Sequence, residues 1–142
     1  MILLDANLLL YAVNTRAPEH AVASAWLKEI FAGPETIGVT WVVLWAFLRI
    51  STSPKIWTQP KTPVEACAYV REWLAQPGVV LVQPGVRHAE LLENLLIKSR
   101  TVGPLVTDAV LAALAIENGA VLASTDRDFS RFEGLRWVNP LA

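Results

Sequence analysis

The sequence predicts an α/β fold in which a short, mostly parallel sheet is covered by helices on both faces. Three observations predict it: short apolar runs alternate with helical segments, Gly-Pro or Pro-Gly pairs separate several of them, and 54% of the residues are hydrophobic. Strands that are buried on both faces of a parallel sheet form continuous apolar runs. The length of 142 residues fits one domain spanning 1–142 with a single core.

Four segments organise the first half of the chain. Residues 1–4 form an apolar run that ends at Asp5, which predicts a buried strand. Residues 18–31 place apolar side chains on one helical face, and Gly33-Pro34 ends that helix. Residues 36–40 predict a second strand. The helix expected over 41–50 is apolar almost all round, so it should be buried on most sides, and a loop with three prolines follows it over 52–63.

The second half repeats the alternation. Thr62-Pro-Val-Glu65 has the spacing of a capping box and predicts a helix to about Ala75. A helix opens at Pro84-Gly85, and another opens at Thr107-Asp108 with Gly119 as its C-cap. The remaining predicted elements are strands over 79–82, 120–123 and 135–138 and a short helical turn over 126–132.

Composition excludes several classes of protein. The chain has 12 Lys and Arg against 13 Asp and Glu, so any nucleic-acid contact must rest on a local basic patch. A single cysteine, Cys67, excludes an internal disulfide and indicates a reducing compartment. The most apolar stretch, 37–50, is shorter than the roughly 20 residues of a membrane span, and Asp5 interrupts any signal-peptide core. We expect a cytoplasmic protein with no membrane segment.

The chemistry is expected at the aspartates, of which the chain has only four: Asp5, Asp108, Asp126 and Asp128. Asp5 ends the first predicted strand, and Asp126 and Asp128 follow the strand at 120–123. Asp108 opens the helix that leads into that same strand. Ligands of open α/β sheets bind at the carboxyl ends of the strands, so these side chains are expected to converge.

Crowded carboxylates raise one another's pKa unless a cation holds them. Mg²⁺ and Mn²⁺ prefer oxygen ligands, and such sites activate water and stabilise charge on a phosphoryl group. The alternative readings are local: Asp108 as a helix cap or first-turn acid, and Asp126 and Asp128 as turn residues. His20 and His88 are interpreted as surface residues, and Cys67 as a core residue.

Four motifs in order resemble the PIN-domain ribonucleases, and most of all the VapC toxins of type II VapBC toxin–antitoxin systems. They are Ile-Leu-Leu-Asp5-Ala-Asn7, Phe47-Leu-Arg49-Ile-Ser-Thr, Thr107-Asp108-Ala-Val-Leu and Ser124-Thr-Asp126-Arg-Asp128-Phe. The resemblance implies a three-layer α/β/α sandwich and a Mg²⁺- or Mn²⁺-dependent toxin endoribonuclease acting on structured RNA such as transfer RNA. It also implies a homodimer neutralised by a VapB-like antitoxin.

Carried over residue by residue, the resemblance makes Asp5, Asp108 and Asp126 the catalytic acids and adds Asp128 to the metal ligands. It makes Asn7 the residue that orders the first acid. Arg49, Arg127 and Arg131 are candidates to contact RNA phosphates, and the alternative for Arg49 is an ion pair with an acid near the site.

One position departs from the family pattern, because the usual second acid falls at Ala46 and no acid occurs between Glu35 and Glu65. Three carboxylates and waters could suffice, or another residue could fill in. The alternative function is therefore a catalytically weak PIN-like RNA-binding or antitoxin-binding module. A more distant alternative, a phosphotransfer domain with Asp5 as nucleophile, lacks a second aspartate two residues on.

The apolar surplus predicts a subunit interface. Five tryptophans are interpreted as core or interface residues, namely Trp26, Trp41, Trp45, Trp57 and Trp73. The helix over 41–50 has no polar side chain before Arg49, so we expect it to contribute to a homodimer.

Overall fold

A computed structural model of the chain, describing residues 1–142, contains a five-stranded, entirely parallel sheet in the order β3-β2-β1-β4-β5. Its first elements are β1 (Ile2–Leu4), α1 (Ala6–Val13), α2 (His20–Ala32), β2 (Ile37–Val39), α3 (Trp41–Ser51) and α4 (Pro63–Leu74). The rest are β3 (Val79–Leu81), α5 (His88–Ser99), η1 (Gly103–Leu105), α6 (Val106–Glu117), β4 (Val121–Ala123), η2 (Arg127–Arg131) and β5 (Trp137–Val138). The predicted α/β class and all five predicted strands are confirmed.

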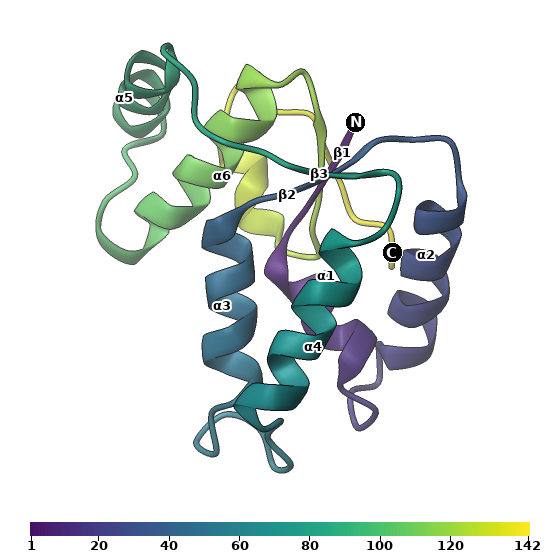
Figure 1. The fold of residues 1–142 in the computed structure, drawn as a ribbon. Helices are drawn as coiled ribbons and strands as arrows, with labels where there is room; N and C mark the ends of the chain where they lie inside the picture. The colour runs from purple at the N-terminus through teal and green to yellow at the C-terminus, as the bar shows by residue number, and fades with distance from the viewer.

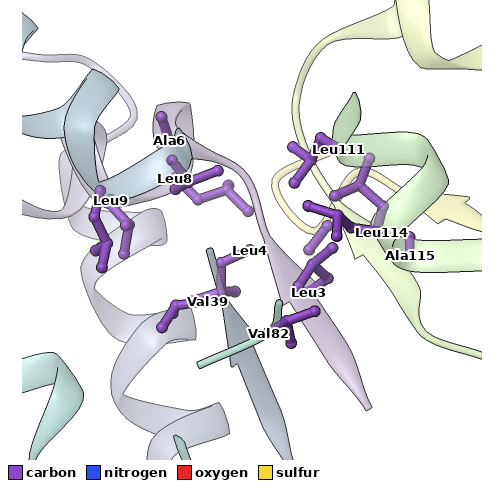
Figure 2. Packing of buried hydrophobic residues seen from close by; sticks show 14 of the residues in the cluster. Leu3, Leu4, Ala6, Leu8, Leu9, Val39, Val82, Leu111, Leu114 and Ala115 are labelled. Atoms are coloured by element: carbon purple, nitrogen blue, oxygen red, sulfur yellow. The ribbon is translucent and has the colours of Figure 1, made fainter. Parts of the chain in front are cut away.

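Helices flank the sheet on both sides. In Figure 1, α5 and α6 lie to the left of the strands, α1, α3 and α4 lie below them, and α2 lies to the right. Adjacent residues of β1 point to opposite faces of the sheet. Figure 2 shows Leu3 beside Leu114 of α6 and Leu4 on the side of α1. Both leucines are fully buried. This two-sided burial explains why β1 is continuously apolar in the sequence.

Local signals at helix ends are confirmed. Thr62 accepts a hydrogen bond from the backbone N–H of Glu65, and the Glu65 carboxylate accepts one from the N–H of Thr62. Gly119 lies just beyond the end of α6 with a φ of +61°, a left-handed conformation that glycine adopts without strain. Here Asn118 is the C-cap residue itself, one position earlier than predicted.

Helix α1 is a finding of the structure, because the sequence pattern predicted no element between Asp5 and residue 18. Its residues, Ala-Asn-Leu-Leu-Leu-Tyr-Ala-Val, extend the apolar run of β1 with little polar periodicity. The side chain of Asp5 accepts a hydrogen bond from the N–H of Ala6 and so caps this helix. A helix with neighbours on several sides shows no clear apolar stripe.

The structure overturns the core prediction for Cys67 and narrows that for Trp45. Cys67 is exposed, because α4 turns Ala66, Val70 and Trp73 toward the core and leaves position 67 off that face. Trp45 is 62% exposed, since α3 buries Val43, Leu44 and Phe47 instead; this excludes a core role and leaves an interface role open.

The two histidines are half-buried rather than on the open surface. His20 Nδ1 lies 2.9 Å from the carbonyl oxygen of Tyr11. His88 Nδ1 lies 3.4 Å from the Glu117 carboxylate. The His20 ring of α2 thus lies against α1, and the His88 ring of α5 lies against α6. None of the helices combines the length and the apolar character that crossing a bilayer requires.

Candidate active site

Asp5 stands at the carboxyl end of β1, as predicted, and both of its carboxylate oxygens are engaged. One accepts the Ala6 N–H at 2.7 Å, and the other accepts the Ser124 hydroxyl at 2.6 Å. Burial raises the pKa of Asp5, the two hydrogen bonds lower it in part, and the charge of Asp126 raises it. The carboxylate is therefore held in a fixed orientation in a poorly solvated place.

Ser124, directly after β4, organises the site and was assigned no role from sequence. Besides donating to Asp5, its fully buried hydroxyl oxygen accepts hydrogen bonds from the Asn7 side-chain amide at 3.1 Å and from the Asp126 N–H at 3.0 Å. Asn7 therefore orders Asp5 through Ser124 rather than directly. The signal that could have found this serine is its place at a strand end, two residues before Asp126.

Asp108 lies half-buried in the first turn of α6, where it makes no capping hydrogen bond. Burial is the largest cause that raises its pKa, to about 6. The charges of Asp126, Asp5 and Asp128 raise it further, in that order, and Arg131 opposes the shift. The charges of the three other aspartates thus act on Asp108. Asp108 does not cap α6, but it is an acid of the first turn, as the local alternative predicted.

Asp126 and Asp128 belong to the turn that opens η2. The Asp126 carboxylate accepts the N–H of Asp128 at 2.9 Å, so the turn interpretation is correct for Asp126. Asp126 is half-buried, whereas Asp128 is exposed. A capping role and an electrostatic role coexist here, because one carboxylate oxygen of Asp126 makes this bond and the charge still acts on Asp108.

Asp5 and Asp108 share a cavity of about 270 Å³ with Ala46 and Arg49 of α3. We call this cavity the acidic cavity. Ala46 therefore borders the site, at the position where the resemblance places the missing acid. Arg49 is exposed and makes no ion pair with any of the aspartates. Arg127 and Arg131 are also exposed, on η2.

The donor set fits a hard divalent cation. Its side-chain donors are carboxylate oxygens, and their mutual repulsion, visible in the raised pKa of Asp108, is what such an ion would relieve. No three His, Cys, Asp or Glu side chains form a preformed cage. A complete cage is not required, because Mg²⁺ commonly uses one or two carboxylates, several waters and substrate phosphates.

A parallel α/β domain with carboxylates gathered at the carboxyl edge of its sheet defines a class of domains that bind their ligands at that edge, here with oxygen donors suited to a hard cation. The PIN domain family model matches residues 2–135. The chain is 47% identical to Ribonuclease VapC33 of Mycobacterium tuberculosis, with 99% of both chains covered. It is 45% identical to Ribonuclease VapC37 of the same organism, over 100% of this chain and 99% of that one.

Solved structures agree on the fold. VapBC2 of Rickettsia felis, bound to a promoter DNA fragment, gives a TM-score of 0.69 at 19% identity, with 98% of both chains covered. M. tuberculosis VapC20, a sarcin–ricin loop cleaving toxin, gives 0.69 at 17% identity, over 96% of this chain and 99% of that one. The chain therefore belongs to the PIN-domain family, in the branch of the VapC toxin endoribonucleases.

Proposed function

We propose that this endoribonuclease depends on Mg²⁺ or Mn²⁺ and that Asp5 and Asp108 hold the ion, with Asp126 as a further ligand or through water. The observation that carries the proposal is that Asp5 and Asp108 border the same cavity, where the charges of the other aspartates raise the pKa of Asp108 beyond the effect of burial. Asp128 is exposed, and its proposed role is either to lie outside the direct ligands of the ion or to act as Asp126 does. The chemistry that the ion supplies when bound is activation of water and stabilisation of charge on the phosphoryl group.

The chain's own residues position the reaction. Ser124 keeps the Asp5 carboxylate oriented by donating its hydroxyl proton to it, and Asn7 fixes Ser124. Arg49 borders the acidic cavity, and Arg127 and Arg131 are exposed on η2, which supports a role for all three in contacting phosphate oxygens of the RNA. These roles support phosphodiester hydrolysis in a structured RNA, with transfer RNA as one candidate substrate.

The proposed partners are a VapB-like antitoxin and a second copy of the chain. Solved relatives of this fold include VapBC complexes, which supports the first. The second rests on an apolar cavity of about 300 Å³ between α3, α5 and α6, flanked by Trp41 and Trp45, whose rings stack 6.3 Å apart. Such a toxin acts where cellular RNA is, so the proposed compartment is the cytoplasm.

The test replaces single aspartates by asparagine, which removes the charge and keeps the size of the side chain. We expect Asp5→Asn and Asp108→Asn each to abolish Mn²⁺ binding in calorimetry and cleavage of an RNA substrate, because each removes one of the two ligands proposed to hold the ion directly. Circular dichroism should show that the fold is retained. Glu133→Gln, an exposed acid beyond η2, is the matched control and should leave both properties unchanged. Metal-dependent cleavage at the wild-type rate by the Asp5→Asn protein would overturn the mechanism.

A further inference from the structure

A second cavity, of about 220 Å³, lies where the loop between α1 and α2 meets the loop between α3 and α4. We call it the basic cavity. One loop contributes Asn14, Thr15 and Arg16, and the other contributes Trp57, Gln59 and Lys61. Both loops lie at the lower end of the molecule in Figure 1, below the helices that flank the site.

Hydrogen bonds of the backbone fix both walls. The Asn14 N–H donates to the carbonyl of Leu10, and the Arg16 N–H donates to the Asn14 side chain. On the opposite wall, the Lys61 N–H donates to the carbonyl of Ser51 at 2.7 Å. Hydrogen bonds of the backbone therefore hold in place both loops that line the cavity.

The charge in this cavity is unbalanced. Neither Arg16 nor Lys61 forms an ion pair, since the two ion pairs of the chain join Met1 to Glu35 and His88 to Glu117. The one acid in the wall, Glu65, accepts the Thr62 N–H in the capping box and keeps its negative charge, which the charge of Lys61 favours. The Lys61 ammonium lies 5.9 Å from the centroid of the Tyr69 ring, and Arg16 has no charged or aromatic partner. With two cations, one acid and several polar side chains, the cavity has an excess of positive charge, which suits an anion.

The basic cavity and the acidic cavity share no lining residue, and the last turn of α3 links them. Arg49 borders the acidic cavity in the last turn of α3, and Ser51, two residues on, receives the Lys61 hydrogen bond. Along α1, eight residues separate the Asp5 cap from the Asn14 end, or about 12 Å at 1.5 Å per residue. That span equals three to four stacked nucleotides at about 3.4 Å each.

We propose that the basic cavity binds a phosphate of the RNA substrate a few nucleotides from the scissile bond, with Arg16 and Lys61 on the phosphate oxygens and the Trp57 indole against a base. Cations that follow the backbone and an aromatic side chain that stacks on a base are the usual combination for single-stranded RNA. The proposal rests on the ribonuclease function and specifies where its substrate lies.

The test compares two double variants that remove the same charge. Arg16→Ala/Lys61→Ala removes the two proposed contacts. Arg71→Ala/Arg87→Ala removes two exposed cations, one in the last turn of α4 and one just before α5. Binding of a fluorescent RNA oligonucleotide is measured without divalent ions at several salt concentrations, and cleavage is measured with Mn²⁺.

We expect the first variant to bind RNA about tenfold more weakly, with a salt slope reduced by about 0.7 per lost phosphate contact. KM should rise and kcat should stay unchanged, because the acids are untouched. Lys61→Arg should keep wild-type affinity. The control pair should keep the wild-type affinity, slope and KM.

Wild-type slope and KM in the Arg16/Lys61 variant, with cleavage intact, would overturn this proposal and leave the ribonuclease function standing. Unchanged RNA binding together with weaker antitoxin binding would also overturn it, by making the cavity a protein site. Absence of metal-dependent cleavage by the wild-type chain would instead contradict the proposed metal mechanism.

Discussion

The Ser124 hydroxyl is hydrogen-bonded to the Asp5 carboxylate, the Asn7 side-chain amide and the backbone N–H of Asp126, so it joins the two ends of the chain. Its bond to Asp5 spans 119 residues and its bond from Asn7 spans 117. Since its single proton goes to Asp5, its oxygen must act as acceptor toward Asn7 and Asp126. This direction of the hydrogen bonds leaves the Asp5 carboxylate as the final acceptor, which favours its ionised form.

The raised pKa of Asp108 predicts a pH dependence of the metal-free protein. A carboxyl group with a raised pKa binds its proton more tightly in the folded state, so its contribution to stability is lost as pH rises from its ordinary value of 3.8 through about 6. In EDTA at pH 7.5, we therefore expect Asp108→Asn to raise the melting temperature. The gain should be only a few degrees, because solvent screens the charge of this half-exposed group.

At pH 4.5 the gain should largely disappear, since Asp108 is then protonated in the folded wild type. Thermal unfolding in EDTA at both pH values measures the effect. Glu133→Gln, an exposed acid, serves as control. An equal gain at both pH values would contradict the electrostatic explanation and point to a packing effect.

Ala46 offers a test of the missing acid. Because Ala46 borders the acidic cavity with Asp5 and Asp108, we expect Ala46→Glu to tighten Mn²⁺ binding by about tenfold, or about 1.4 kcal/mol. Calorimetry measures the affinity. Ala46→Gln adds nearly the same volume without the charge and should give little gain. Equal affinities for Ala46→Glu and wild type, with the fold retained, would mean that three carboxylates already saturate the site.

At the scale of elements, α4 shows how a local signal sets a helix start. The reciprocal bonds between Thr62 and Glu65 satisfy two backbone donors at the helix end. Thr62→Ala should lower the free energy of unfolding by about 1 kcal/mol, as measured by urea denaturation. Thr58→Ala, in the exposed loop before it, is the control and should change stability little. A loss of the same size in both variants would contradict the capping role.

Helix α3 shows the opposite case, in which composition alone misleads. Val43, Leu44 and Phe47 enter the core, and Phe47 packs edge-on against Trp73 with ring centroids 4.7 Å apart. Trp41 and Trp45 are left on the outer face, although they are as apolar as the buried residues. The helix therefore has one buried face and one exposed apolar face, which we expect to be an interaction surface.

At the scale of the whole molecule, that outer face predicts the assembly. Burying Trp45 in a dimer would contribute on the order of 2–4 kcal/mol per copy. We expect the wild type to sediment as a dimer without antitoxin, and Trp45→Glu to sediment as a folded monomer or to bind antitoxin more weakly. Val22→Glu, which changes an exposed apolar residue of α2, should stay dimeric. A wild-type monomer at tens of micromolar would refute the dimer.

The sequence by itself determined the α/β class, the five strands, the capped start of α4 and the strand-end positions of the acids. These features depend on short-range physics: apolar runs that must be buried, caps that satisfy backbone donors, and glycine at a left-handed position. Each signal lies within a few residues of the feature that it specifies. The four resembling motifs added the family and its active-site acids.

Only the tertiary structure decided which groups meet. Asp5 finds Ser124 across the sheet because β1 pairs with β4, with Leu4 opposite Ala123. Tertiary packing also decided that α1 is a helix and that Cys67 and Trp45 face outward. The physical reason is that burial and long-range hydrogen bonds depend on which neighbours cover a residue, and the local sequence does not contain those neighbours.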